Sequence, residues 1–339
     1  MYKVLQKILF LLPPEVAHHF TLSSLSTLNI IGLLKLIKPV SKANQEVEVM
    51  GIKFPNRIGL AAGLDKDGEH IQALSNLGFG FVEIGTVTPR PQAGNPAPRL
   101  FRLPKANAII NRMGFNNKGI DHLTDQVANA RKAGFDGIIG INIGKNFDTA
   151  VENATEDYLI GLRHAYRYAD YITINISSPN TPGLRTLQYG EELDKLLSAI
   201  KKEQLKLVNS QKKYVPIAVK VAPDLESLEI TGIAEALLEN NIDCLIATNT
   251  TLSRDAVIGM KHGAEAGGLS GEPVREMSTE VIKQFHAILK DQIPIIGVGG
   301  ISSAQHAQDK LDAGAELVQV YSGLIYEGPA LVKKLLKVS

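Results

Sequence analysis

Short apolar runs alternate with longer amphipathic stretches along most of this 339-residue chain. Eight of the apolar runs are rich in Ile, Val and Gly, as buried strands are; they cover residues 57–62, 81–85, 137–143, 171–176, 216–221, 244–248, 294–298 and 317–321. Amphipathic segments of helical period lie between most of these runs and after the last one, at residues 69–77, 120–133, 152–169, 191–209, 227–240, 278–290, 303–313 and 329–336. Alternating strands and helices predict a parallel sheet with both faces covered.

The number of these units favours one α/β architecture. Eight strand–helix units across about 280 residues are typical of a (β/α)8 TIM barrel. A doubly wound open sheet is the alternative, but no strand–GxGxxG–helix unit lies near the start of the pattern. Catalytic and binding residues of a barrel sit at the carboxyl ends of its strands, so we expect the functional residues of this chain there.

A different, helical pattern precedes the barrel pattern. Residues 2–12 and 15–37 carry regularly spaced apolar residues on either side of Pro13-Pro14, which predicts a small helical subdomain over residues 1–40 and a barrel domain over residues 41–339. Residues 39–56 predict a linker with a small hairpin. Polar residues interrupt every turn, whereas a membrane span needs about 20 predominantly apolar residues. No small-residue cleavage site follows, as it would in a secretory signal.

Two interpretations of this subdomain stay open from periodicity alone. The two helices form either a hairpin packed on the rest of the protein or a pair with one apolar face open to a bilayer surface or an apolar ligand. In the second case, the whole chain could serve as a peripheral membrane binding module whose barrel is only a scaffold.

The composition excludes several classes of protein. The chain is 44% hydrophobic and 21% charged, which is ordinary for a globular protein, and its net charge of +1 gives no reason to expect a nucleic-acid partner. Cys244 is the single cysteine, so we expect no internal disulfide, no cysteine-rich metal site and a reducing compartment. No HExxH motif and no paired carboxylates of the glycosidase type occur, so no metal is expected.

The most polar strand end follows the run at residues 171–176. The loop Asn-Ile-Ser-Ser-Pro-Asn-Thr-Pro-Gly-Leu-Arg at 175–185 contains two amides, two serines, a threonine and two prolines. A capped turn before a helix is one interpretation. Polar or glycine-rich residues, however, follow the other seven runs as well. Turn formation does not explain such residues at all eight strand ends, so the loop is predicted to belong to a site.

Lys220 lies inside an apolar strand, where a lysine is rarely buried without a partner. Three interpretations of Lys220 are open. Its amine extends to solvent at the edge of the sheet, it is the Schiff-base nucleophile of a phosphate-binding lyase or aldolase, or it is a cation that faces an anionic cofactor. Gly297-Val298-Gly299-Gly300 and Tyr321-Ser322-Gly323 follow the seventh and eighth strands, the usual phosphate-binding position of a barrel.

Five asparagines lie in or near the strand-end loops: Asn111, Asn142, Asn175, Asn180 and Asn249. An amide is neutral and both donates and accepts hydrogen bonds. Any one of them could be a turn residue, but together they suit a planar ligand with several carbonyl and N–H groups, such as a pyrimidine ring or an isoalloxazine.

Six motifs in one order resemble the dihydroorotate dehydrogenase family, and specifically its membrane-associated, quinone-reducing class 2. They are A-A-G-L-D-K-D at 61–67, N-R-M-G-F-N-N at 111–117, N-I-S-S-P-N-T at 175–181, A-T-N-T-T at 247–251, G-G-L-S-G at 267–271 and P-I-I-G-V-G-G at 294–300. The resemblance spans essentially the whole chain.

The resemblance implies an FMN enzyme that oxidises dihydroorotate to orotate in pyrimidine biosynthesis. By motif, the residues expected to bind FMN are Ala61, Ala62, Gly63, Leu64, Asp65, Lys66, Thr86, Asn142, Asn175, Lys220, Thr248, Gly271, Gly300, Tyr321 and Ser322. The residues expected to contact the substrate are Lys66, Asn111, Arg112, Met113, Gly114, Phe115, Asn175, Asn180, Asn249 and Thr250.

The resemblance also assigns chemical roles. Ser178 is expected to remove the proton from C5 of the substrate while hydride leaves C6 for flavin N5, and Thr181 is expected to pass that proton outward. A serine hydroxyl is a poor base by itself, so it needs a relay or a neighbouring cation. Lys220 is expected near the N1/C2 carbonyl edge of the flavin, where its charge stabilises the reduced ring.

The class follows from two features. Soluble class 1 enzymes have a cysteine base in the loop that carries Ser178 here, and class 2 enzymes have an N-terminal helical subdomain over a tunnel through which a quinone reaches the flavin. The resemblance makes His18 and Arg102 candidate tunnel residues, with the choice between His18 and His19 open. It also implies peripheral attachment to the cytoplasmic face of the inner membrane.

Overall fold

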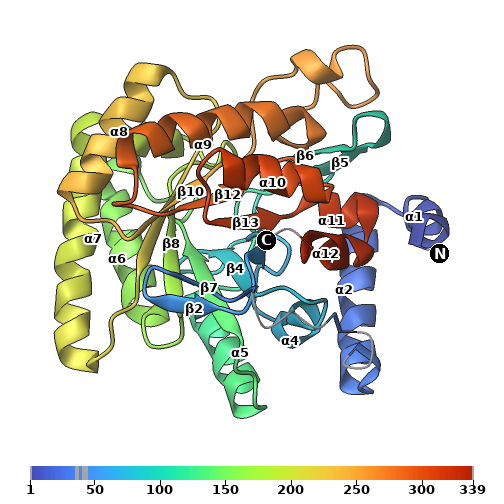
Figure 1. The fold of residues 1–339 in the computed structure, drawn as a ribbon, viewed down its shortest axis with the longest axis horizontal. Helices are drawn as coiled ribbons and strands as arrows, with labels where there is room; N and C mark the ends of the chain where they lie inside the picture. Colours follow the sequence, from blue (N-terminus) through green and yellow to red (C-terminus); the bar gives the residue numbers. More distant parts are fainter. Residues whose placement is uncertain (1, 35–37, 40–44, 338–339) are drawn as a thin grey trace.

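The computed structural model describes residues 2–34, 38–39 and 45–337. It begins with two helices, α1 (Tyr2–Leu9) and α2 (Pro14–Ile30), which lie to one side of the barrel (Figure 1). Pro13 and Pro14 separate them, as expected, because proline ends one helix and fits the first turn of the next. The helix expected over residues 15–37 is too long: α2 ends at Ile30, and Gly32 follows with a φ of +79° that no helix continues through. Residues 35–37 and the predicted boundary at residue 40 lie outside the described ranges.

Eight parallel strands close into a barrel, which confirms the predicted fold class. In spatial order they are β10 (Cys244–Ala247), β12 (Ile295–Val298), β13 (Leu317–Val320), β3 (Ile58–Leu60), β4 (Phe81–Val87), β7 (Ile138–Ile143), β8 (Tyr171–Asn175) and β9 (Ile217–Val221). Each lies within or overlaps one predicted apolar run.

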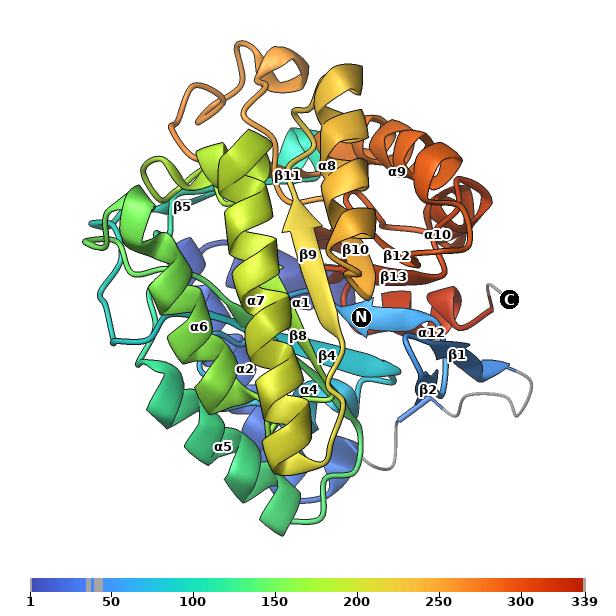
Figure 2. The same ribbon diagram turned by 90° about the vertical axis from the view of Figure 1, so that its left-hand side faces the viewer.

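The predicted helices surround this barrel. They are α4 (Ile71–Ser75), α5 (Ile120–Lys132), α6 (Ala154–Ala165), α7 (Gly190–Gln211), α8 (Ser227–Glu239), α9 (Arg275–Leu289), α10 (Ala304–Asp312) and α12 (Ala330–Leu335). Figure 2 shows α5, α6, α7 and α8 side by side on the outside of the strands. The pattern did not predict α11 (Ser322–Glu327), which follows β13 directly. No helix in the described ranges is long and apolar enough to cross a bilayer.

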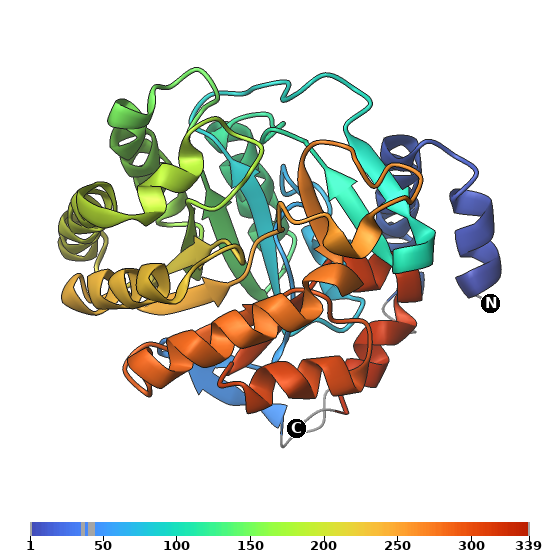
Figure 3. The ribbon, with the colours of Figure 1, turned by 90° about the horizontal axis from the view of Figure 1, so that it is seen from above.

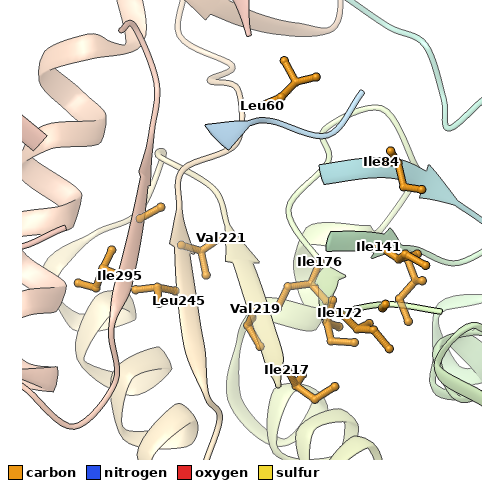
Figure 4. Packing of buried hydrophobic residues seen from close by; sticks show 14 of the residues in the cluster. Leu60, Ile84, Ile141, Ile172, Ile176, Ile217, Val219, Val221, Leu245 and Ile295 are labelled. Carbon is orange, nitrogen blue, oxygen red and sulfur yellow. The ribbon is translucent and has the colours of Figure 1, made fainter. Parts of the chain in front are cut away.

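The strands bury both faces, but with different partners. Alternate residues such as Leu60, Ile84, Ile141 and Ile172 face the helices and belong to the main core cluster (Figure 4). Their intervening neighbours face the barrel axis, because side chains alternate along a strand. The side chains in the barrel interior therefore form a second buried cluster, separate from the core between the strands and the helices.

Aromatic rings fill the amino-terminal end of that interior. A hairpin of β1 (Val47–Val49) and β2 (Ile52–Phe54) brings Phe54 against Phe81, with ring centroids 5.1 Å apart, and Phe81 lies 6.3 Å from Tyr171. Gly59 and Gly140 make room for these rings: a Cβ at either position would lie 2.2 Å from the Phe81 or Tyr171 ring. We call this layer the floor of the barrel.

The sequence pattern did not predict a separate, three-stranded antiparallel sheet. It consists of β5 (Leu100–Leu103), β6 (Ala108–Asn111) and β11 (Gly268–Gly271), in the order β11-β6-β5. Figure 3 shows the teal segment of β5 and β6 beside the dark-blue N-terminal helices, and β5 contacts α2. The sheet carries Asn111 and Gly271, two predicted site residues, on its ends.

Candidate active site

A cavity opens at the carboxyl ends of the barrel strands, where the fold places functional residues. It encloses about 1020 Å³ that protein atoms do not fill, including the part open to solvent. The predicted site residues that line it are Ala61, Ala62, Gly63, Lys66, Thr86, Asn111, Met113, Gly114, Phe115, Asn175, Ser178, Asn180, Lys220, Thr248, Asn249, Thr250, Gly271, Gly300, Tyr321 and Ser322. Segments that are up to 262 residues apart in the sequence, from Ala61 to Gly323, thus meet around one space.

A chain of buried hydrogen bonds fixes the amides on one wall. The Asn175 side-chain amide donates to Thr86 Oγ1 at 2.8 Å, and the Thr86 hydroxyl donates to Asn142 Oδ1 at 2.6 Å. The Asn142 amide in turn donates to Glu83 Oε1 at 2.7 Å. Each side chain has a partner that determines its orientation, so the wall presents fixed donors and acceptors rather than mobile ones.

A second pair of amides extends this polar surface toward the opening. The Asn180 side-chain amide donates to Asn111 Oδ1 at 3.1 Å, which joins the loop after β8 to the end of β6. Asn249 Nδ2 donates to Ser177 Oγ at 3.0 Å. The five asparagines singled out in the sequence therefore belong to one cluster, although Asn142 lies behind Thr86 and does not line the cavity itself.

Ser178 lies on the cavity wall with 6% of its surface exposed. Its Oγ accepts the Asn180 backbone N–H at 3.3 Å. Thr181 does not line the cavity, but it is buried three residues further along the same loop, and its Oγ1 has no hydrogen-bond partner among the described residues. A buried hydroxyl without a partner is costly and calls for a ligand or a water molecule.

Lys220 carries a buried amine that forms no hydrogen bond with the described part of the chain and faces the cavity. Burial lowers the pKa of Lys220, and the nearby Glu83 carboxylate opposes that shift. Lys66 is the other lysine on the cavity wall, where burial lowers its pKa to about 8. Two lysines on one wall, neither of which donates a hydrogen bond to a described residue, make the cavity suitable for an anionic ligand.

Glycine-rich turns form the opposite wall. Gly299 and Gly300 follow β12 with φ values of +129° and +72°, which favour glycine strongly. A Cβ on Gly300 would lie 2.4 Å from Arg275 Cβ, so the backbone approaches the start of α9 closely. Ser322 Oγ lies 2.8 Å from Ser270 Oγ, which joins the turn after β13 to β11.

Several residues assigned by motif support the wall from outside the cavity. Asp65 accepts the backbone N–H groups of Glu69 and His70 at 3.0 and 2.8 Å, and burial raises its pKa against those hydrogen bonds. Arg112 donates to Glu265 at 2.7 Å and stacks on the Phe101 ring. The residues expected at the ligand that do not line the cavity are Leu64, Asp65, Arg112 and Asn142.

The two candidate tunnel residues also lie outside the cavity lining. His18 is half-buried, and burial together with the charge of Lys66 lowers its pKa to about 3, whereas His19 is exposed. His18 is therefore the imidazole that points inward. Arg102 binds the end of α1: its guanidinium donates to the carbonyl oxygen atoms of Leu9 at 3.2 Å and Phe10 at 3.4 Å.

Sequence reasoning missed two residues that organise the cavity. Glu83 accepts hydrogen bonds from Asn142, Tyr171 and Gln319 in the barrel interior. Arg185 donates to the carbonyl oxygens of Ser177 at 3.1 Å and Thr250 at 2.8 Å, and so joins two of the loops. A carboxylate in the apolar run at residues 81–85 was the available signal for Glu83, because such a residue is rarely buried without partners.

Comparisons with known proteins show which family the chain resembles. A family model described as "Dihydroorotate dehydrogenase" matches residues 44–338. The chain is 58% identical over 335 residues to the "Dihydroorotate dehydrogenase (quinone)" of Acinetobacter baylyi, with 98% of each chain covered. It is also 58% identical over 333 residues to the protein of the same name from Aliivibrio fischeri, with 98% of each chain covered.

A solved structure extends the likeness to the fold. The crystal structure of DHODH from Eimeria tenella in complex with ferulenol superposes with a TM-score of 0.87 at 38% identity, covering 96% of this chain and 90% of that one. Both the sequence and the fold therefore place the chain in the dihydroorotate dehydrogenase family.

Proposed function

We propose that the chain oxidises dihydroorotate to orotate with FMN as the hydride acceptor and a membrane quinone as the final electron acceptor. The observation that carries the proposal is the convergence on one cavity of Ser178, four asparagines and the Lys220 amine, which forms no hydrogen bond with the described residues. The names of the quinone-dependent relatives support the same activity.

The residues present fit FMN. The cavity lies at the carboxyl ends of the barrel strands and combines apolar side chains with a few convergent polar groups, as small-molecule sites do. Lys220 would hold the polar edge of the flavin, and the turns that contain Gly300 and Ser322 would hold its phosphate through backbone N–H groups. When bound, FMN supplies a ring that accepts hydride.

The asparagine cluster would recognise the substrate. Dihydroorotate has two ring carbonyls, two ring N–H groups and a carboxylate, so it needs both donors and acceptors around it. Asn111, Asn175, Asn180 and Asn249 offer both, and their mutual hydrogen bonds hold them in place. Lys66 supplies a positive charge for the carboxylate.

Ser178 would move the proton. Its Oγ would take the proton from C5 of the substrate, which a hydroxyl does only if the proton can move on. Thr181 supports such a relay, because its buried hydroxyl lies on the same loop and has no partner among the described residues. Arg185 would keep the loop in place through its hydrogen bond to the Ser177 carbonyl oxygen.

The N-terminal helices would deliver the quinone. Their large apolar side chains are widely exposed, among them Val4, Leu5, Ile8, Leu11 and Phe20. An apolar face of this kind is typical of a helix that lies on a membrane surface. We therefore infer peripheral attachment to the cytoplasmic face of the inner membrane, with neutral His18 and Arg102 near the route to the flavin.

The visible spectrum of the purified protein tests the function directly. We expect flavin absorbance that bleaches on anaerobic addition of dihydroorotate and returns on addition of a quinone. A colourless protein that FMN does not reconstitute would contradict the proposal. Trapping of a carbonyl substrate on Lys220 by borohydride would then favour the Schiff-base lyase or aldolase that the sequence left open.

A further inference from the structure

Behind the glycine-rich wall of the cavity lies a second buried lysine, Lys310, on α10. No part of its surface is exposed. Its Nζ donates to the Arg275 carbonyl oxygen at 2.8 Å, to Thr279 Oγ1 at 2.6 Å and to Ser278 Oγ. All three acceptors belong to the first turns of α9, so one ammonium group joins α10 to the beginning of α9.

The partners of Lys310 touch the glycine turn itself. The Ser278 Oγ lies 3.3 Å from the Gly299 carbonyl oxygen and 3.0 Å from the Arg275 carbonyl oxygen, so its single proton is shared between the glycine turn and the first turn of α9. A Cβ on Gly299 would lie 2.5 Å from Ser278 Oγ, and one on Gly300 would lie 2.9 Å from the Arg275 backbone nitrogen. Lys310, Ser278 and the turn are therefore in continuous contact, with no room for the turn to shift toward α9.

The charge of Lys310 is not neutralised by a contacting carboxylate. Its three hydrogen-bond partners are neutral oxygens, and no acidic group in the described ranges lies within ion-pair distance of it. The surrounding charges are Arg275, Glu272 and Asp309, while His306 lies 3.8 Å from Glu272. Burial lowers the pKa of Lys310 to about 7, with Arg275 acting in the same direction. An anion on the other side of the turn would stabilise the buried ammonium.

We propose that Lys310 is a positioning residue for the phosphate end of the cofactor: it fixes Ser278 and the first turn of α9, and thereby holds Gly299 and Gly300 on the cavity wall. This inference rests on the proposed function, because FMN supplies the phosphate. Lys310 does not line the cavity, so it acts through the glycine turn and through its charge.

Flavin affinity of the full-length protein tests the inference. The fluorescence of released flavin on dilution of the FMN-loaded protein gives a dissociation constant, and titration with riboflavin gives the same quantity for a ligand without a phosphate. Lys310→Met should raise the dissociation constant for FMN about tenfold and leave that for riboflavin unchanged. Ser278→Ala, a smaller change, should raise the constant for FMN about threefold.

A matched control is available in Lys145. This lysine is also buried and, like Lys310, does not line the cavity and donates to neutral oxygens, here the carbonyl oxygens of Asn146 and Thr149. None of its hydrogen bonds among the described residues reaches the glycine turn or α9. Lys145→Met should change neither constant.

Three results would overturn the inference. One is an unchanged FMN constant in Ser278→Ala and in folded Lys310→Met; another is an equal loss of affinity for FMN and riboflavin, which would mean a general effect on the fold. A wild-type protein that binds neither flavin would overturn the proposed function, and this inference with it.

Discussion

The two ends of the barrel interior are built from opposite chemistry. At the floor, Phe54, Phe81 and Tyr171 interlock edge to face and leave no space. At the opposite, carboxyl-terminal end of the strands, which we call the mouth, amides, hydroxyls and Lys220 surround an open cavity. The apolar floor holds the barrel closed, and this lets the mouth keep the Lys220 amine and the Thr181 hydroxyl without a hydrogen-bond partner in the described part of the chain.

Glu83 separates the two ends. It accepts hydrogen bonds from the Tyr171 hydroxyl at 2.9 Å on the floor side and from Asn142 at 2.7 Å on the mouth side. The carboxylate thus connects the packed aromatic layer to the amides of the site. Changes above this layer should affect catalysis, and changes below it should affect stability.

The largest effect is expected at the mouth, for Ser178→Ala. Loss of the base should slow flavin reduction by dihydroorotate about 10²–10⁴-fold at neutral pH. Because Ser178 Oγ accepts a single hydrogen bond in the structure, bound FMN and the free energy of unfolding should stay near wild type. Stopped-flow absorbance under anaerobic conditions measures the rate. Full turnover by the alanine variant would remove Ser178 from its assigned role.

At the floor, Phe81→Ala should cost about 3–5 kcal/mol of unfolding free energy, because a large fully buried ring leaves a cavity. Urea denaturation measures it. Phe147→Ala is the control, since that ring is 50% exposed, and should change the unfolding free energy by no more than about 0.5 kcal/mol. Equal losses in the two variants would contradict the separation between floor and surface.

Tyr171→Phe tests the boundary layer. The ring remains, but Glu83 loses one hydrogen-bond donor, which should cost about 1–3 kcal/mol of unfolding free energy. The same denaturation measurement applies. Tyr168→Phe, at a partly buried tyrosine on the outside of the barrel, serves as the matched control. A loss no larger than that of the control would mean that the Glu83 network carries little energy.

The smallest effect is expected from pH. Burial lowers the pKa of Lys66 to about 8, so the amine is charged below this pH and neutral above it. Because the charged form attracts the substrate carboxylate, KM for dihydroorotate should rise up to about tenfold per pH unit above pH 8. Steady-state kinetics between pH 7 and 10 measure the effect. Lys66→Arg should remove this rise, because a guanidinium stays charged; persistence of the rise in that variant would assign it to another group.

The barrel and most of the site could be predicted from the sequence for a physical reason. Buried parallel strands must be continuously apolar, and their carboxyl ends meet in space, so polar strand ends such as Asn175 and Thr248 indicate one site. The sheet of β5, β6 and β11 was missed because its strands have four residues each and pair residues near 110 with residues near 270. The periodicity of apolar residues within a short segment does not predict pairing between segments so far apart in the sequence.

The motifs predicted which residues lie at the site, but they did not distinguish residues that line the cavity from residues that hold its wall in place. Asp65 accepts backbone N–H groups of its own loop, and Arg112 donates to Glu265, so both residues of the matched motifs have structural partners. Their orientation depends on partners far away in the sequence. Likewise, the helix expected through Ile37 ends earlier because Gly32 adopts a left-handed conformation, which apolar spacing does not record.

The mouth leaves the Lys220 amine without a hydrogen bond to any described residue, so that a ligand can use it. The most direct measurement is the unfolding free energy of the flavin-free Lys220→Met variant, together with its affinity for FMN. We predict weaker FMN binding and a flavin-free protein about 1 kcal/mol or more stable than wild type, because the variant no longer buries an unpaired cation. A flavin-free variant that is less stable than wild type, with FMN affinity unchanged, would contradict the account.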